Sequence, residues 1–567
     1  MKNKIIAIIL SVSVLLGVFM IPVSANTEVT EPGKQKMYTF IDKLVNTLVG
    51  GIASMIVTPD WPSKKDYKTP DTFFPGNSKE EFKSATATDA WYVGYSNNSI
   101  VTGNEVGGNG DYYVGGSLKV TKKLATKQLD DQKVRVAAIS DGGKINIFAV
   151  IDAYGLANTD VRAIRNQFIE QYKGDKEINT INISVLHQHS CVDTFGLNGD
   201  IINALFTSSL KNLFRAKTKS GKNEDYMKNL YEKTVDSMNK AVAGMKAGKL
   251  YFGKIDAENY IRDKRDPQVF DHNLNRLRFV PNDGSKEIWI VEAAIHCVGR
   301  GAGGTELTGD YPLYMERYIN NNDNADFLYL EGAELAISGN DRTTVYDDDG
   351  NCTYVGDVQT YADEHKVYDT DDNGNKIWNG KWIDESWNSD ISDIRAYGES
   401  LAIKLEEINE EREIEPIINV AFKETYIKID NNILVLAAKG GLLVNNVLKS
   451  GFGKFEIVTE IGYAELGTDL SIALIPGELA PEIAFGGAEG ADKSWYNEDW
   501  DYPSFTEMVN GRELLVFGLM NDQIGYILPS NNWHSYFTEN EEIVSTGRYA
   551  GRVITESFEE LVEDIKG

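Results

Sequence analysis

Three of the six histidines in the chain stand where apolar segments end, and imidazoles in that setting can bind a metal ion. The apolar segment 181–185 leads into His187 and His189, and the segment 287–295 leads into His296. Neutral imidazole is the commonest zinc ligand, and a catalytic zinc usually has three protein ligands and one open position. A single histidine at a strand end is usually structural, but three in the same setting favour a metal site.

Two histidines need a harder third ligand, and Glu478 is the best-placed carboxylate. It follows Pro476 and Gly477 after an apolar segment, although an ordinary turn glutamate would occupy the same position. Cys191 and Cys297, each within two residues of a histidine, are an alternative ligand pair. Such a thiolate site would be structural, and neither cysteine has the close spacing that is typical of one.

A sheet must position these residues. Residues i and i+2 of a strand point the same way, so we expect His187 and His189 to project together from a strand end. A helix at 159–172 between strands at 145–151 and 181–185 predicts a parallel layer in a mixed α/β fold. Other expected strands lie at 91–95, 134–139, 287–297 and 514–518, and 327–340 is expected to form a strand and a polar turn. The segments 250–280 and 416–474 are expected to be strand-rich, and other helices are expected at 226–247, 391–410 and 545–566.

The composition indicates a globular protein that does not bind nucleic acid. Hydrophobic residues make up 42% of the 567 residues, and the formal net charge of −28 would repel phosphate. Residues 1–25, with two lysines before an apolar run and a small-residue cleavage site, predict a signal peptide and a secreted, extracellular protein. An uncleaved membrane anchor is the alternative. We expect a wrapping segment at 26–89 and one large domain at 90–567.

Residues 341–390 are rich in Asp, Asn, Gly and Trp and are interpreted as an acidic insertion in a loop. Asp369, Asp371, Asn373 and Gly374 match the first half of a calcium-binding loop, which would give a Ca²⁺ or Mg²⁺ site. The twelfth position of that loop is Gly380 and not the required glutamate. A solvated acidic hairpin is therefore the favoured interpretation.

From residue 90 to 560 the chain resembles the catalytic domain of the neutral/alkaline (non-lysosomal) ceramidase family. The family's His-Thr-His-Ser-Gly-Pro resembles residues 187–192, and its second zinc histidine resembles His296 with residues 309–312 downstream. Its Gln-Gly-Ala-Ala-Gly-Asp-Val-Ser is similar, without gaps, to residues 331–338. Its Leu-Pro-Gly-Glu and Asn-x-Tyr-x-Gly-Tyr-Val resemble residues 475–478 and 521–527. The five short motifs occur in the family's order.

The resemblance implies a zinc-dependent amidohydrolase that cleaves the N-acyl amide bond of ceramide or a related lipid amide. It assigns Zn²⁺ to four ligands, which are His187, His296, Glu478 and Tyr526. It places His189 beside the metal as a hydrogen-bonding group for the amide carbonyl or the tetrahedral intermediate, and Ser338 near the zinc-bound water. A substrate-contacting arginine falls on Arg265, with Arg262 and Lys264 as close alternatives. A lipid substrate would also bring the protein into peripheral contact with membranes.

The chain departs from the family's motifs at several positions beside the expected site. Cys191 and Val192 replace Gly-Pro, Leu335 and Ala336 replace Gly-Asp, and Gly339 replaces a proline. Two other hypotheses are therefore kept beside the enzyme. One is a catalytically impaired binding protein of the same fold at the cell surface, and the other is a structural protein with the three histidines in its core.

Overall fold

The computed structural model describes residues 32–566 apart from 87, 108–111, 117–123, 198–221, 340–344, 347–351, 354–360, 372, 385, 389, 442 and 538–540. The expected signal peptide at 1–25 and parts of the insertion at 341–390 lie outside the described residues.

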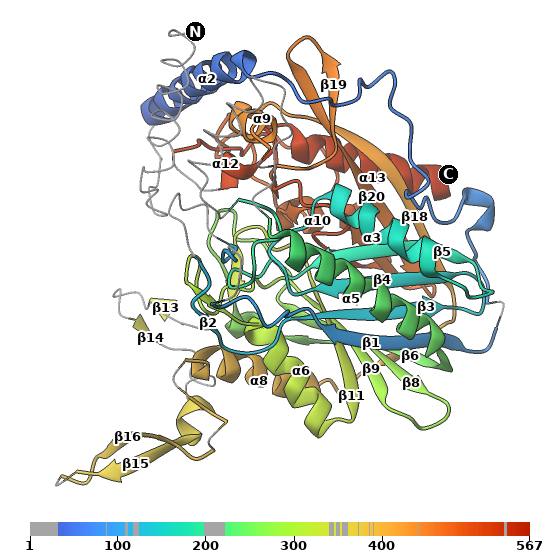
Figure 1. The fold of residues 1–567 in the computed structure, drawn as a ribbon, viewed down its shortest axis with the longest axis vertical. Coiled ribbons are helices and arrows are strands. Elements are labelled where there is room, and N and C mark those ends of the chain that lie inside the picture. Colours follow the sequence, from blue (N-terminus) through green and yellow to red (C-terminus); the bar gives the residue numbers. More distant parts are fainter. Residues whose placement is uncertain are drawn as a thin grey trace.

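The largest element is a nine-stranded mixed sheet with the order β11-β9-β8-β6-β1-β3-β4-β5, in which β17 also pairs with β6 (Figure 1). Strands β4 and β5 are parallel and α3 connects them, which confirms the expected strand–helix–strand unit. The strands are β1 (Trp91–Ser99), β3 (Lys133–Ser140), β4 (Ile145–Ile151), β5 (Ile178–Val185), β6 (Lys246–Asp256), β8 (Asn273–Pro281), β9 (Glu287–Ala293), β11 (Ala325–Glu331) and β17 (Arg412–Ile414).

A second, five-stranded sheet packs face to face with the first. Its order is β18-β20-β21-β23, with β19 paired to β20. Phe148 of β4 and Phe517 of β23 meet edge to face with ring centroids 6.2 Å apart, inside a buried apolar cluster that both sheets share. The strands are β18 (Ile418–Lys428), β19 (Val447–Gly451), β20 (Lys454–Leu466), β21 (Leu470–Leu474) and β23 (Glu513–Phe517).

Helices cover the outer faces of both sheets, which gives a layered α/β fold and confirms the expected fold class (Figure 1). Ile164 of α3 and Met238 of α5 pack on the nine-stranded sheet, and Phe558 of α13 meets Tyr463 of β20. No helix of the described part is long and apolar enough to span a bilayer. The helices are α2 (Pro32–Met55), α3 (Asn158–Gln171), α5 (Glu224–Ala243), α6 (Asp310–Asn322), α8 (Ser392–Glu406), α9 (Asn432–Lys439), α10 (Pro481–Phe485), α11 (Phe505–Met508), α12 (Glu541–Val544) and α13 (Ala550–Lys566).

Short strand pairs join the loops around the sheet ends. The pair β22–β24 and the pair β7–β12 matter most, because they carry residues that the sequence assigns to the site. The short strands are β2 (Lys127–Gln128), β7 (Ile261–Asp263), β10 (Glu306–Leu307), β12 (Ile337–Gly339), β13 (Val345–Tyr346), β14 (Cys352–Thr353), β15 (Lys366–Thr370), β16 (Lys376–Trp382), β22 (Glu478–Leu479) and β24 (Tyr526–Ile527).

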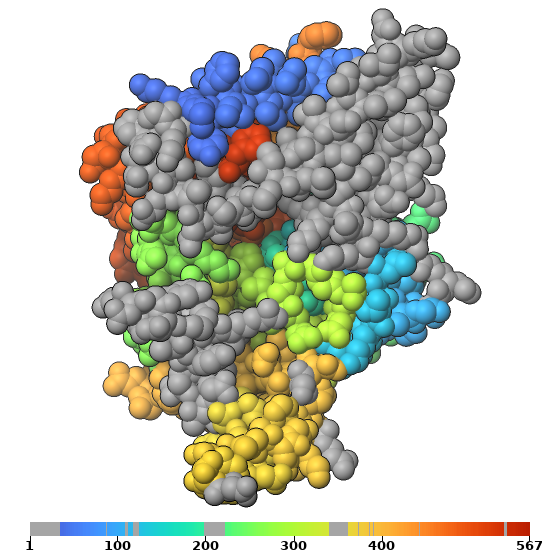
Figure 2. Space-filling model, turned by 90° about the vertical axis from the view of Figure 1, so that its left-hand side faces the viewer, coloured from blue at the N-terminus to red at the C-terminus, as the bar shows by residue number. Residues whose placement is uncertain are grey.

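The described part of the insertion forms the hairpin β15–β16, which projects from the body of the protein (Figures 1 and 2). The Asp371 carboxylate accepts hydrogen bonds from the backbone N–H groups of Asn373 and Asn375 within the exposed turn. The carboxylate that a calcium loop would use therefore stabilises the turn instead. This geometry fits the favoured interpretation, a solvated acidic hairpin.

Candidate metal centre

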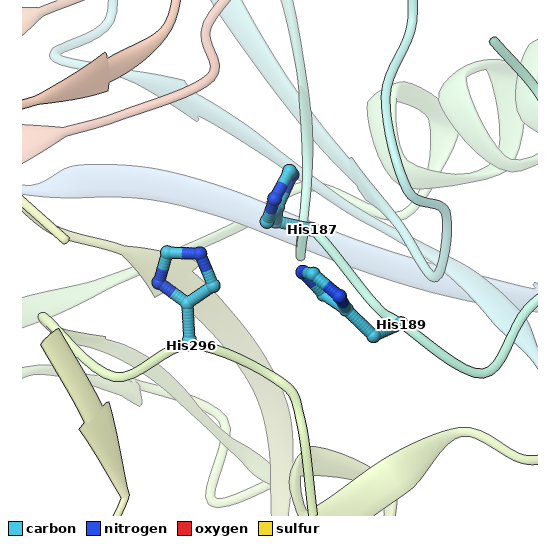
Figure 3. Close-up of side chains that lie close together, drawn as sticks. All are labelled: His187, His189 and His296. Atoms are coloured by element: carbon cyan, nitrogen blue, oxygen red, sulfur yellow. The ribbon is translucent and has the colours of Figure 1, made fainter. Parts of the chain in front are cut away.

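The three histidines of the sequence prediction meet in one buried cluster (Figure 3). The ring centroid of His187 lies 4.8 Å from that of His189 and 4.9 Å from that of His296. The expected reason for the first contact was wrong, because β5 ends at Val185 and His187 lies beyond the strand. His187 has a left-handed backbone with a φ of 47°, so a turn and not the alternation of a strand aims its ring.

A backbone carbonyl fixes the orientation of each imidazole. The Nδ1 atom of His187 lies 2.9 Å from the carbonyl oxygen of Tyr154, that of His189 lies 2.6 Å from Gly116 O, and that of His296 lies 3.1 Å from Glu334 O. A carbonyl oxygen can only accept, so each Nδ1 carries the hydrogen and each Nε2 keeps a lone pair. This is the arrangement that orients metal-binding histidines.

Glu478 brings a carboxylate to the same place from the second half of the chain. Its Oε2 atom lies 3.5 Å from His187 Nε2 and 3.2 Å from His296 Nε2. Neither His187 Nε2, His189 Nε2 nor Glu478 Oε2 has a hydrogen-bond partner among the described residues. Lone pairs of imidazole and carboxylate that face one another in a buried site repel unless a cation lies between them. The residues present therefore fit a divalent metal ion.

The electrostatics of the cluster prepare it for a cation. Burial lowers the pKa of His187, His189 and His296 to about 3 each, so all three imidazoles are neutral at pH 7. Burial also raises the pKa of Glu478. A divalent cation would reverse this shift, because it stabilises the ionised carboxylate directly.

Tyr526 lies beside Glu478, because the two residues are register partners in the parallel pair β22–β24. Its phenol acts as a hydrogen-bond donor that lowers the pKa of Glu478, against the larger effect of burial. Gln523 donates from Nε2 to Glu478 Oε1 at 2.9 Å and orients the carboxylate from the other side. The sequence interpretation had not singled out Gln523, although it lies inside the motif that contains Tyr526.

The expected catalytic residues occupy different positions around the cluster. Ser338 is buried, and its backbone forms an isolated parallel bridge with His296. Arg265 donates from its guanidinium to Glu542 Oε1 at 2.8 Å and to Asn532 O at 3.0 Å. The neighbouring Lys264 is exposed, and its charge helps to depress the pKa of the site histidines 189 and 296. The substrate contact assigned to Arg265 stays a prediction.

The alternative thiolate site is not formed. Cys191 and Cys297 are both buried and free. The Cys191 thiol donates to Gln188 O at 3.1 Å, and the Cys297 thiol donates to Glu331 Oε1 at 3.2 Å. Neither sulfur belongs to a group of possible metal ligands among the described residues.

The sequence interpretation missed Glu334, a second carboxylate in the cluster. Its side chain is 0% exposed, and its Oε2 atom lies 3.3 Å from His296 Nδ1. Its one sequence signal is a glutamate at a position where the family's motif has alanine.

A small apolar cavity of about 50 Å³ adjoins Glu478. Most of its wall is apolar, with polar side chains from Asn445, Gln523 and Thr546 besides Glu478, so the cavity favours a mainly apolar ligand. The lining includes Tyr154, Phe195, Leu197, Leu434, Leu443 and Ile524.

Comparison with solved structures identifies a neutral ceramidase-like fold, as the sequence motifs had predicted. The chain superposes on the neutral ceramidase from Pseudomonas aeruginosa with a TM-score of 0.57 and 14% identity, over 84% of this chain and 74% of that chain. A ceramidase complexed with C2 gives a TM-score of 0.56 and 14% identity, over 84% and 75% of the two chains. No protein-family model and no curated protein matches the sequence.

Proposed function

We propose that the protein is a secreted, zinc-dependent amidohydrolase that cleaves the N-acyl amide bond of ceramide or a related lipid amide. The observation that carries this proposal is the approach of His187 Nε2 and His296 Nε2 to Glu478 Oε2 in a buried site, where neither His187 Nε2 nor Glu478 Oε2 has a hydrogen-bond partner among the described residues. His187, His296 and Glu478 would hold the metal, with Tyr526 as the fourth ligand that the ceramidase resemblance implies. The neutral ceramidase-like fold supports the choice of an amide bond over other hydrolysable bonds.

When bound, zinc would lower the pKa of a water molecule and polarise the substrate carbonyl. His189 presents a free lone pair at Nε2, because its Nδ1–H donates to Gly116 O. With a pKa of about 3 the neutral imidazole is a weak base, but Nε2 can accept a hydrogen bond from the attacking water and orient it. The ceramidase resemblance implies a hydrogen-bonding role for His189 at the amide carbonyl or the tetrahedral intermediate.

The apolar cavity beside Glu478 supports a lipid substrate. It can take part of an aliphatic chain next to the scissile bond, where a peptide would place polar groups. The ceramidase complexed with C2 supports the same class of substrate through its fold alone.

Metal analysis and an N-acyl amide panel test the proposal. We expect the purified mature protein to hold stoichiometric zinc and to hydrolyse a lipid amide, and His187→Ala and His296→Ala each to lose both properties. His365→Ala is the control, because His365 belongs to none of the groups of possible metal ligands among the described residues. Absence of stoichiometric zinc, or full activity in either site variant, would refute the proposal. Bound zinc without hydrolysis of any lipid amide would favour the impaired binding protein instead.

We also propose that α2 docks the protein on membranes that contain the substrate. One face of α2 packs on α9 through Val49 and Ala53, while large apolar side chains on the rest of the helix are exposed. Lys36 and Lys43 on the same helix are exposed and would attract anionic lipids, although the whole chain is acidic. The exposed apolar side chains are Met37, Phe40, Leu44, Leu48 and Met55.

Vesicle flotation tests this contact. We expect the mature protein to float with vesicles of mixed anionic and neutral lipid, and a variant with Phe40→Ser and Leu44→Ser to remain in solution. Phe452→Ser is a matched control, because Phe452 is exposed outside α2. Equal flotation of the α2 variant and the control would exclude docking through this helix.

A further inference from the structure

Glu334 has no ordinary partner for its charge. The residue lies in the loop between β11 and β12, and its side chain is fully buried. No N–H group or hydroxyl among the described residues donates to either of its carboxylate oxygens, and the side chain that it contacts is another acid, Glu331. The charges that act on it most strongly are those of two further carboxylates, Glu331 and Glu478. An ionised carboxylate in this setting is strongly destabilised unless a cation compensates it.

The geometry places Glu334 within reach of the candidate metal site. One of its oxygens, a ring nitrogen of His187 and an oxygen of Glu478 all lie within 4.8 Å of one another. On another side, Glu334 Oε2 lies 3.3 Å from His296 Nδ1. The carboxylate therefore touches the same cluster from which His187 and Glu478 project, and it enters from a different loop.

We propose that Glu334 is a ligand of the metal ion, together with His187 and Glu478. This inference rests on the proposed metal centre and extends it beyond the ligand set that the ceramidase motifs imply, because the motif has alanine at this position. Two carboxylates neutralise a divalent cation, whereas one leaves a net positive charge in the buried site. They also make the donor set harder, which favours oxygen-preferring divalent ions such as Mn²⁺ more than a histidine-rich set does.

Two other roles would give Glu334 the same surroundings. It could orient His296 through Nδ1 without touching the metal, or it could share a proton with Glu331 as an uncharged neighbour. Glu331 provides a matched control for both. It is the last residue of β11, is equally buried and contacts Glu334, but its oxygens also accept hydrogen bonds from the Cys297 thiol and from Ile295 N.

A zinc titration in a chelator-buffered series separates these roles in the full-length mature protein. We expect Glu334→Gln to lower the affinity for Zn²⁺ by more than about 100-fold, because loss of an orienting partner typically costs about 10–100-fold. Glu331→Gln should stay within about threefold of the wild type. A loss of 100-fold or less in Glu334→Gln, or an equal loss in both variants, would overturn the assignment.

Cobalt substitution gives a second readout that does not depend on activity. The ligand-field bands of bound Co²⁺ should change in position and intensity in Glu334→Gln and Glu334→Ala, and should match the wild type in Glu331→Gln. Unchanged bands in both Glu334 variants would also overturn the assignment. Wild-type protein that binds neither Zn²⁺ nor Co²⁺ would refute the metal centre itself, which separates that failure from an error about Glu334. Circular dichroism confirms that each variant is folded.

Discussion

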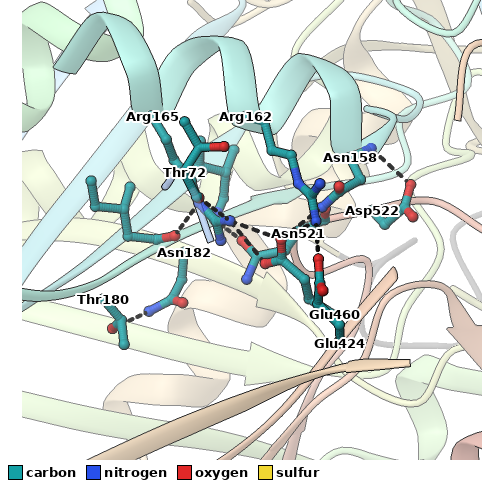
Figure 4. Close-up of polar contacts among 12 residues, drawn as sticks. Thr72, Asn158, Arg162, Arg165, Thr180, Asn182, Glu424, Glu460, Asn521 and Asp522 are labelled. Atoms are coloured by element: carbon teal, nitrogen blue, oxygen red, sulfur yellow. Dashed lines mark hydrogen bonds and ion pairs between the residues drawn. The ribbon is translucent and has the colours of Figure 1, made fainter. Parts of the chain in front are cut away.

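A buried ion pair between α3 and the five-stranded sheet provides a quantitative test of what holds these two elements together (Figure 4). The Nη1 atom of Arg165 in α3 lies 2.8 Å from Glu460 Oε2 in β20, and each side chain is 1% exposed. Glu460 also accepts from Asn158 Nδ2 at 3.1 Å, and Asn158 N donates to Asp522 Oδ1 at 2.8 Å. The pair therefore links α3, the five-stranded sheet and the loop that leads to Tyr526. Glu460→Gln removes the charge and keeps the shape.

The expected loss is large because the remaining guanidinium stays buried. Breaking a buried ion pair by removing one partner costs about 3–5 kcal/mol. Arg165 keeps the carbonyl oxygens of Ile181 at 2.9 Å and Thr72 at 3.1 Å as acceptors, so we expect the lower end, about 3 kcal/mol. The exposed pair of Asp236 and Lys240 on α5 should contribute only about 0–1 kcal/mol.

Urea denaturation of the metal-free protein measures both effects under the same conditions. We expect the free energy of unfolding to fall by about 3 kcal/mol in Glu460→Gln and by less than about 1 kcal/mol in Asp236→Asn. The slope of the unfolding free energy against urea concentration should equal that of the wild type, because both variants expose the same surface on unfolding as the wild type does. If Glu460→Gln lowers the unfolding free energy no more than Asp236→Asn does, then the buried pair does not hold α3 to the five-stranded sheet.

Three further outcomes are expected. In Gly116→Ala, the new Cβ would lie 2.3 Å from His189 Cα at a backbone φ of +85° and would displace His189. Hydrolysis should therefore fall, while mass spectrometry should find zinc retained. Loss of zinc would instead indicate that His189 is a ligand. Each site imidazole has a folded pKa of about 3, below the unfolded value of about 6.5, so its contribution to metal-free stability is present above pH 6.5 and falls on acidification, by about 2 kcal/mol at pH 5. Because Glu478 has a raised pKa and contributes with the opposite sign, the effect is measured as the difference in unfolding free energy between wild type and His189→Gln at pH 8, 6.5 and 5; a difference that does not change with pH would contradict it. Arg265→Ala should lower the melting temperature because it leaves a buried glutamate unpaired, whereas exposed Lys264→Ala should not change it. Steady-state kinetics then tests the predicted substrate contact: a raised KM in Arg265→Ala would support Arg265, and a raised KM in Lys264→Ala alone would favour Lys264.

Local sequence predicted the main elements of the fold where periodicity is strong. The strand expected at 145–151 matches β4, because its β-branched and aromatic residues form one buried run. The helix α9 was not expected within the strand-rich segment 416–474. Its sequence is apolar on all sides, so strand and helix patterns look alike, and the Asn431 side chain that accepts from Ile433 N selects the helix.

The candidate site was predictable in its residues but not in its geometry. His187, His296 and Glu478 were found because each follows an apolar segment, and the structure brings them together. The orientation of His187 depends on the carbonyl group of Tyr154 and that of His296 on the carbonyl group of Glu334, which no side-chain pattern reveals. Burial of a glutamate such as residue 334 follows from the packing of loops that are distant in sequence, so local sequence cannot predict it.

The carbonyl groups that orient the imidazoles have a consequence for how such a site changes over evolution. A carbonyl at residue 154 persists whatever side chain stands there, provided the chain keeps its path, whereas residue 116 must stay glycine because a Cβ would clash with His189. Mutations around the cluster can therefore accumulate without turning the rings away from one another. An arrangement held by the main chain can outlast most of the sequence that surrounds it, which fits a chain that shares a fold with ceramidases at 14% identity. A search for distant relatives would then do better to compare backbone geometry around the three rings than to compare side-chain motifs.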